Sequence, residues 1–163
     1  MPRVVVIGLG IFGYNVVKNL FEGGMDVIAI DKNKDAVQKV RDYSSRAIVA
    51  DGIDKSVMDS IGIGADDVVI LSFGEDLAAS TLATLHLKQL GVRNIIVKAP
   101  NEEHKLVLEK VGATEVIIPE KEMANKLARG FISPNLIDYI PLSDDYMICE
   151  TAPPKQFIGK SLR

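Results

Sequence analysis

A glycine-rich loop near the start of the chain holds the residues with the clearest potential for chemistry. Gly8, Gly10 and Gly13 follow an apolar run over residues 4–7, and an apolar helical pattern follows them. Gly8 permits a tight turn, Gly10 lacks the Cβ that would hold the backbone away from a phosphate, and Gly13 lets a helix pack closely on a sheet. The free amides and the dipole of that helix would face an anion. The loop therefore predicts a dinucleotide-type phosphate site.

An acidic residue ends the second apolar run of the chain. This run, residues 27–30, leads into Asp31, which follows Gly13 by about the ~20 residues expected for a carboxylate that accepts ribose hydroxyls. An acid here disfavours the 2′-phosphate of NADP, although the adjacent Lys32 weakens that inference. The alternative is a strand-to-helix turn that binds no ligand. The combination of two strands, a helix and an acid favours the nucleotide site.

The composition is that of an ordinary globular protein. The chain has 163 residues, 47% hydrophobic and 25% charged, which suits one domain with a substantial core. No apolar run approaches the ~18 residues of a membrane span, and no signal-peptide pattern begins the chain. A net charge of −3 without a basic stripe argues against nucleic acid as a partner. The single Cys149 agrees with a reducing cytosol, so we expect a cytoplasmic protein.

Alternating strands and helices organise most of the chain. Helical patterns cover residues 33–42, 76–90 and 101–111, and short apolar runs that follow helix-ending glycines predict further strands. Six strands with intervening helices predict an α/β fold, a Rossmann-like, doubly wound and mostly parallel sheet followed by a crossover helix. Ligands of such sheets bind at the carboxyl ends of the strands. Polar groups at those ends, which we expect to face one crevice, include residues 31–33, 50–52 and 72–75.

The last part of the chain differs from these repeated units. After Pro119 and Glu120 comes a helical pattern with an apolar stripe made of Met123, Ala124, Leu127, Ala128 and Phe131. Residues 135–140 are also apolar and are predicted to add a second apolar helical face. The stripe suits either a subunit interface or a simple covering helix. Residues 146–152 alternate as a strand does, and they suggest the first hairpin of a second lobe.

These segments together resemble the RCK (regulator of K⁺ conductance) domains, whose N-terminal part is the TrkA-N domain, and in particular the cytosolic Trk/Ktr-type subunits of potassium uptake systems. The resemblance implies an N-terminal nucleotide-binding domain over residues 1–142 and the beginning of a C-terminal RCK lobe over residues 143–163. The segments that carry it are residues 8–13, 29–31, 50–52, 80–84, 97–99, 106–113, 118–124 and 139–146.

The resemblance also implies how an adenine nucleotide, whether NAD(H), ADP, ATP or AMP, would be bound. It implies that the phosphates lie beside Gly8, Gly10, Phe12 and Gly13, and that Asp31 holds the ribose, with Lys32 and Asn33 next to it. It further implies that Asp51 and Gly52 flank the adenine, that Ser72, Phe73 and Gly74 cover the nucleotide, and that Lys98 points inward. Ktr-type subunits commonly carry Arg where this chain has Ile11. Because Ile11 cannot make that charged hydrogen bond, the case for the additional phosphate of ATP is weaker.

The same resemblance implies partners. It predicts a homodimer that assembles into a larger ring, peripheral to the inner face of the membrane through a membrane potassium channel or transporter subunit. Glu120 matches an acid that holds a divalent or monovalent cation in Ktr-type proteins. The alternative for Glu120 is simple compensation of a helix dipole.

Two function classes follow from these observations. The first is an NAD-dependent oxidoreductase with its substrate domain missing. Such an enzyme needs a substrate held against the nicotinamide and a positioned acid or base. His86, His104 and Cys149 are the residues of neutral-range reactivity, and none has a recognisable catalytic partner in the sequence. A non-enzymatic nucleotide-sensing switch that gates potassium transport is therefore the favoured hypothesis.

Overall fold

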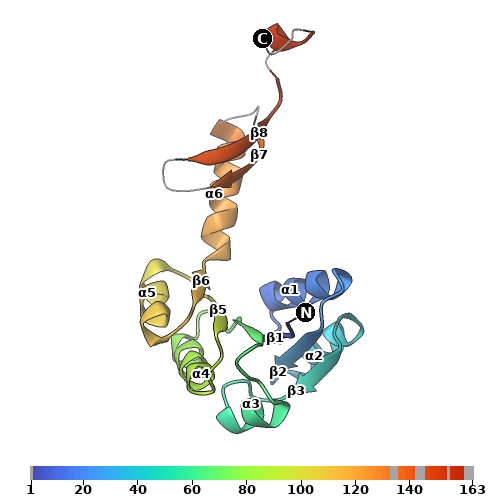
Figure 1. Ribbon diagram of the computed structural model, residues 1–163, viewed down its shortest axis with the longest axis vertical. Coiled ribbons are helices and arrows are strands. Elements are labelled where there is room, and N and C mark those ends of the chain that lie inside the picture. The colour runs from blue at the N-terminus through green and yellow to red at the C-terminus, as the bar shows by residue number, and fades with distance from the viewer. Residues whose placement is uncertain (1, 133–135, 142–145, 154, 160–163) are drawn as a thin grey trace. The chain divides into compact units, whose positions relative to one another are not determined.

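Six short parallel strands form the central sheet, as the sequence predicts. The computed structural model describes residues 2–132, 136–141, 146–153 and 155–159, and it divides into two compact units, residues 1–118 and 119–163. Within the first unit the strand order is β3-β2-β1-β4-β5-β6 (Figure 1), so the order reverses between β1 and β4. The strands are β1 (Val4–Ile7), β2 (Val27–Asp31), β3 (Arg46–Val49), β4 (Val68–Leu71), β5 (Asn94–Lys98) and β6 (Glu115–Ile117).

Helices pack on both faces of this sheet and bury its alternating side chains. Two helices, α1 (Ile11–Glu22) and α2 (Lys34–Val40), share one apolar cluster with Val4, Val6 and Ile70. The opposite face carries a second cluster, to which α3 (Lys55–Ile61), α4 (Leu77–Gln89) and α5 (Glu102–Val111) contribute. The doubly wound Rossmann-like prediction is therefore confirmed.

Side chains cap the first turns of α4 and α5. Asp76 accepts a hydrogen bond from the Ala79 amide at the start of α4, and Asn101 accepts one from the His104 amide at the start of α5. Helix α3 was not predicted. Asp54 begins it. The Asp54 carboxylate accepts hydrogen bonds from the Ser56 hydroxyl and the Ser56 amide, and these two bonds lower the pKa of the carboxyl.

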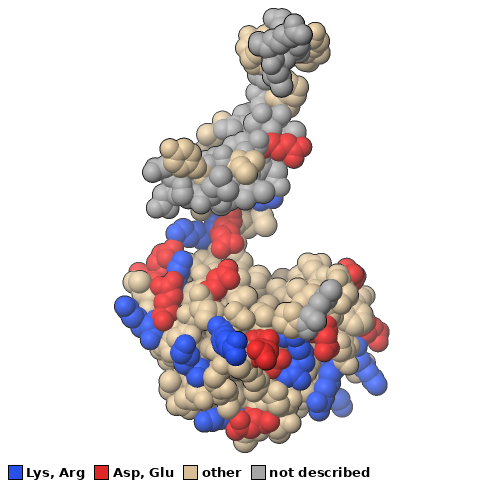
Figure 2. Space-filling view, in the orientation of Figure 1, with Lys and Arg blue, Asp and Glu red and all other residues tan. Residues whose placement is uncertain are grey.

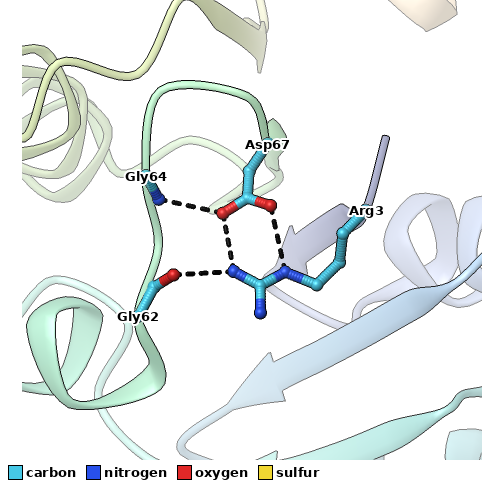
Figure 3. A network of polar contacts seen from close by, with 4 residues as sticks. All are labelled: Arg3, Gly62, Gly64 and Asp67. Atoms are coloured by element: carbon cyan, nitrogen blue, oxygen red, sulfur yellow. Dashed lines mark hydrogen bonds and ion pairs between the residues drawn. The ribbon is translucent and has the colours of Figure 1, made fainter. Parts of the chain in front are cut away.

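An ion pair joins the amino ends of the two central strands (Figure 3). Arg3 immediately precedes β1 and Asp67 immediately precedes β4, and the guanidinium donates through Nε at 3.0 Å and Nη2 at 2.7 Å to the two carboxylate oxygens. The same Nη2 donates to the Gly62 carbonyl, and the Gly64 amide donates to Asp67. This bidentate pair fixes β1 beside β4 at the edge opposite the glycine-rich loop.

The second unit contains a long helix and a hairpin. Helix α6 (Pro119–Ile132) matches the predicted crossover helix, and β7 (Leu136–Pro141) pairs antiparallel with β8 (Met147–Thr151). A short 3₁₀ turn, Lys155–Phe157, follows. The hairpin was predicted from residue 146 onward, but the helical interpretation of residues 135–140 was wrong, because residues 136–140 lie in β7. The predicted boundary between residues 142 and 143 lies outside the described residues.

Large apolar side chains on α6 are open to solvent. Met123, Leu127, Phe131 and Ile132 are 64%, 63%, 79% and 79% exposed, and the described residues of α6 include no buried one. A helix with an apolar stripe requires a partner surface to bury it. None of the helices in the described part of the chain is long and apolar enough to span a lipid bilayer.

Charged side chains of both signs are interspersed on the visible face of the molecule. Figure 2 shows Lys and Arg residues next to Asp and Glu residues over the first unit, without one broad area of a single sign on that face. This face therefore lacks the continuous basic area along which a nucleic-acid backbone binds.

Candidate functional site

The glycine-rich loop is built as its glycines predict. Gly8 has a φ of +95°, and a Cβ there would collide with the Ser72 carbonyl oxygen at the end of β4. A Cβ on Gly13 would collide with the Gly8 carbonyl oxygen and reach within 3.7 Å of Val6 Cγ1. The tight turn at Gly8 and the close helix–strand approach at Gly13 are therefore confirmed.

The amino end of α1 is exposed and uncapped. Gly10 occupies the N-cap position, no side chain caps the first turn, and that turn, which the structure describes in full, has no acidic residue. A Cβ on Gly10 would meet nothing within 4 Å, so the space above the loop is open. Ile11 is 90% exposed. Backbone amides that lack intrahelical partners point out of such a terminus, which can bind an anion.

Asp31 connects the end of β2 to this loop. One carboxylate oxygen, Oδ2, accepts the Leu9 amide at 2.7 Å, and the other, Oδ1, accepts the Asn33 amide at 2.8 Å. A carboxylate oxygen can accept two hydrogen bonds, so each retains acceptor capacity for a further donor such as a ribose hydroxyl. The contact with Leu9 was not predicted, because a backbone amide at a variable position leaves no signal in the sequence.

Other predicted residues meet at the same carboxyl edge of the sheet. The Ser72 amide donates to the Ile7 carbonyl at 2.8 Å, and a Cβ on Gly52 would collide with the Ile7 side chain. The ends of β1, β3 and β4 therefore lie close together. Phe73 packs partly buried against the core, and Gly74 turns the chain with a φ of +68°.

Lys98 approaches the loop from β5. Its Nζ lies 5.9 Å from the centroid of the Phe12 ring in the first turn of α1. The predicted inward direction of Lys98 is thus consistent with its contact. Because β4 separates β5 from β1 in the sheet, this side chain extends across the point where the strand order reverses.

Three other predicted site residues lie in their own local surroundings. Lys32 is exposed, and the Asp51 carboxylate accepts the Ile53 amide at 3.1 Å in its own turn. Glu120 belongs to the second unit, at the start of α6. The described residues contain no group of three or more His, Cys, Asp or Glu side chains that could hold a metal ion. A cation at Glu120, which the resemblance places near a dimer interface, therefore stays a prediction.

Neither histidine of the chain lies in an arrangement typical of catalysis. Nδ1 of His86 lies 2.8 Å from the Ile53 carbonyl oxygen, a contact between α4 and the segment before α3. His104 lies in the first turn of α5 beside Glu102 and Glu103. The contact of His86 is therefore one between secondary-structure elements.

Sequence comparison relates most of the chain to potassium uptake proteins. The chain is 40% identical over 157 residues to the Ktr system potassium uptake protein C of Bacillus subtilis (strain 168), covering 96% of this chain and 71% of that protein. It is 41% identical over 160 residues to the Ktr system potassium uptake protein A of the same organism, covering 98% of this chain and 72% of that protein.

Solved structures share the fold at lower identity. The NAD(P)-binding domain of an exopolyphosphatase-related protein from Archaeoglobus fulgidus aligns with a TM-score of 0.66 at 24% identity, covering 82% of this chain and 97% of that one. The GsuK channel bound to NAD aligns with a TM-score of 0.65 at 13% identity, covering 88% and 26%. Residues 4–119 match the TrkA-N domain family. The chain therefore belongs to the TrkA-N domain family.

Proposed function

We propose that this chain is a nucleotide-sensing regulatory subunit that gates a potassium channel or transporter. Membership of the TrkA-N family and relatives named as Ktr potassium uptake proteins, of which the chain covers 71% and 72%, support this role. The observation that carries the nucleotide part is the open amino end of α1, with Asp31 hydrogen-bonded to the same loop.

The ligand is an adenine nucleotide held along the carboxyl edge of the sheet. Its phosphates face the amides that follow Gly10, where the helix dipole favours negative charge. Its ribose hydroxyls donate to the remaining acceptor positions of Asp31, whose Oδ2 also accepts the Leu9 amide of the loop. Asp51 and Gly52 flank the adenine, and the segment of Ser72, Phe73 and Gly74 covers the nucleotide.

Gating follows from differential affinity. A nucleotide that binds two arrangements of an assembly unequally shifts their balance, and this shift is passed to the pore subunit. Moving a balance from 1:99 to 99:1 requires roughly a 10⁴-fold difference in affinity, so even a partial response needs substantial changes in the contacts of the site. The binding residues lie on four strand ends that any rearrangement of the sheet edge would move.

The assembly is a homodimer, formed in part by the exposed stripe of α6, that joins into a larger ring. Residues 1–142 act as the nucleotide-binding domain and residues 143–163 begin a C-terminal lobe. The subunit is cytoplasmic and peripheral to the inner face of the membrane through its pore partner. A regulatory role is preferred to an oxidoreductase, because His86 contacts a backbone carbonyl and neither histidine is paired with a described catalytic group.

Two experiments test the proposal at different levels. Thermal unfolding with NAD⁺, NADH, ADP, ATP or AMP should show a raised melting temperature for at least one nucleotide, since a ligand that binds only the folded state stabilises it. Co-expression with a Ktr-type membrane subunit in bacteria that lack potassium uptake should then restore growth at low potassium. Regulation by the nucleotide would be contradicted if growth did not depend on this chain. It would also be contradicted if a variant that does not bind nucleotide supported growth equally well. Steady nicotinamide turnover with alcohols or hydroxy acids would favour the oxidoreductase instead.

A further inference from the structure

Lys98 lies on the face of the sheet that carries the glycine-rich loop. Alternation along β5 places Ile95 and Val97 in the apolar cluster of α3, α4 and α5, whereas Ile96 packs against the cluster of α1 and α2. Lys98 is two residues after Ile96 on the same strand, so its side chain projects from the same face of the sheet, toward α1. Its Nζ is 5.9 Å from the centre of the Phe12 ring, within the range of a cation–π contact.

The Phe12 ring marks the place where phosphates of a bound nucleotide would lie. Phe12 is two residues after Gly10, and its own amide belongs to the first turn of α1. An anion held by the amides of this turn would lie beside the ring and within the radius swept by the flexible lysine stem. The ammonium can therefore pass from the ring to a phosphate by side-chain rotation, without a shift of the backbone.

The two contacts differ in strength and in their dependence on ligand charge. A charge-assisted hydrogen bond between an ammonium and a phosphate is stronger than the attraction between an ammonium and an exposed aromatic face. It also grows with the charge on the phosphate, whereas an uncharged ligand offers the ammonium no charged acceptor. A positive charge here also adds to the attraction that the helix dipole exerts on an anionic ligand.

We propose that Lys98 is the residue that distinguishes nucleotides by their phosphate charge, and that Phe12 is its positioning residue. The proposal rests on the nucleotide function proposed above and deepens it. Lys98 strengthens the binding of a diphosphate and contributes nothing to the binding of the bare nucleoside. Phe12 restricts the ammonium to the neighbourhood of the loop, which reduces the conformational freedom lost when it contacts the phosphate.

The test compares ADP with adenosine, measured by calorimetry and by ligand-observed NMR for the weaker ligand. Lys98→Met, which removes the charge and retains the length of the side chain, should weaken ADP binding by about tenfold or more and change adenosine binding by less than about twofold. Lys98→Arg should restore most of the ADP affinity. Lys110→Met, which removes the same charge from the exposed side of α5, is the matched control and should leave both affinities unchanged.

A double-mutant cycle tests the role of Phe12. Phe12→Leu should weaken ADP binding about threefold in the wild-type background and have almost no effect in the Lys98→Met background, because the ring acts through the ammonium. Independent, additive losses would overturn the positioning role. Equal losses for ADP and adenosine in Lys98→Met would overturn charge recognition and indicate a structural role. Unchanged ADP binding in Lys98→Met would overturn the proposal while leaving the nucleotide function intact, and a wild-type chain that binds neither ligand would overturn both.

Discussion

The Leu9 amide donates to Oδ2 of Asp31 at 2.7 Å, which ties the glycine-rich loop after β1 to the end of β2. The same carboxylate therefore holds the shape of the loop and, in the proposed complex, offers acceptors to a ribose. These two tasks reinforce each other, because a loop fixed in position exposes its amides to an anion without a further ordering cost.

Removing this carboxylate should weaken nucleotide binding more than it weakens the fold. Asp31→Ala eliminates the acceptors for the ribose and for Leu9, and we expect a loss of about 1–3 kcal/mol in binding free energy by calorimetry. Asp35→Ala, an exposed aspartate in the first turn of α2, is the control and should bind normally. Full affinity in a folded Asp31→Ala protein would remove Asp31 from the site.

Substitutions at Gly10 and Gly13 should have different effects, with Gly10→Ala weakening nucleotide binding and Gly13→Ala lowering the stability of the fold. A Cβ on Gly13 collides with the Gly8 backbone, so Gly13→Ala should lower the free energy of unfolding by about 1–3 kcal/mol or more. A Cβ on Gly10 meets nothing within 4 Å, so Gly10→Ala should cost only the difference between Gly and Ala at an N-cap, about 0.5–1 kcal/mol, while obstructing a phosphate. Urea unfolding and calorimetry measure the two effects. A strongly destabilised Gly10→Ala variant, or one that binds normally, would contradict this division.

The sequence was sufficient for the sheet and the loop because both depend on local patterns. Continuous apolar runs specify parallel strands, and the spacing of Gly8, Gly10 and Gly13 specifies the turn into α1. Helix α3 was missed although Asp54 caps it and Met58 and Ile61 form its apolar face, since its 7 residues span too few turns for a clear period. Residues 136–140 were misassigned because a short apolar run does not distinguish a strand from a helix.

Contacts between distant segments could not be predicted in the same way. The bond from Leu9 to Asp31 involves a backbone amide, and the approach of Lys98 to Phe12 depends on which strands are neighbours. For the ion pair between Arg3 and Asp67, the sequence contains one usable indication, which is that each residue immediately precedes a central strand. Strand order decides whether two such residues meet, and it is a property of the whole fold.

The Arg3–Asp67 pair should give the stability of the protein a dependence on acidity. Burial raises the pKa of the Asp67 carboxyl, but the hydrogen bonds from Arg3 and Gly64 and the guanidinium charge outweigh it, so the pKa lies below its ordinary value. A group whose pKa is lowered on folding contributes stability above its unfolded pKa of about 3.9, and this contribution is lost as pH falls through the folded value.

Denaturant unfolding between pH 7 and pH 3 measures this contribution. Asp67→Asn should lower the free energy of unfolding by about 1–3 kcal/mol at pH 7, and the difference from wild type should shrink below about pH 4. Asp66→Asn is the matched control, because its 3.7 Å contact with Arg93 joins side chains that are 93% and 72% exposed. That exposed pair should be worth less than about 1 kcal/mol. A constant difference across the pH range would indicate a role other than the ion pair.

Ile11 offers a gain-of-function test of the loop. The side chain is 90% exposed at the first position of α1, so Ile11→Arg should leave the free energy of unfolding nearly unchanged. A guanidinium at this position would supply the charged donor that Ktr-type proteins commonly carry, and it should improve ATP binding more than AMP binding. We expect the ratio of ATP to AMP affinity to rise by about tenfold in calorimetry. Ile11→Gln, which has length without charge, should not produce this change.

The exposed stripe of α6 should be an interface between two copies of the chain. Phe131 and Ile132 are each 79% exposed, and Met123 and Leu127 continue the same apolar surface. Phe131→Glu would place a charge without a designed partner in that interface, so it should convert a dimer or larger assembly into monomers in light-scattering measurements. The first unit should remain folded, with an unchanged circular dichroism spectrum, because its two apolar clusters contain no residue of α6.

Asn125→Glu, which adds the same charge elsewhere on α6, controls for net charge and should leave the assembly intact. Its side chain is not part of the apolar stripe, so its substitution changes the charge of the helix without changing the surface that we expect to be buried. Dissociation by both variants would indicate general charge repulsion. A wild-type chain that stays monomeric at high concentration, or a Phe131→Glu variant that unfolds without a change in assembly, would instead place the stripe in contact with the rest of its own chain.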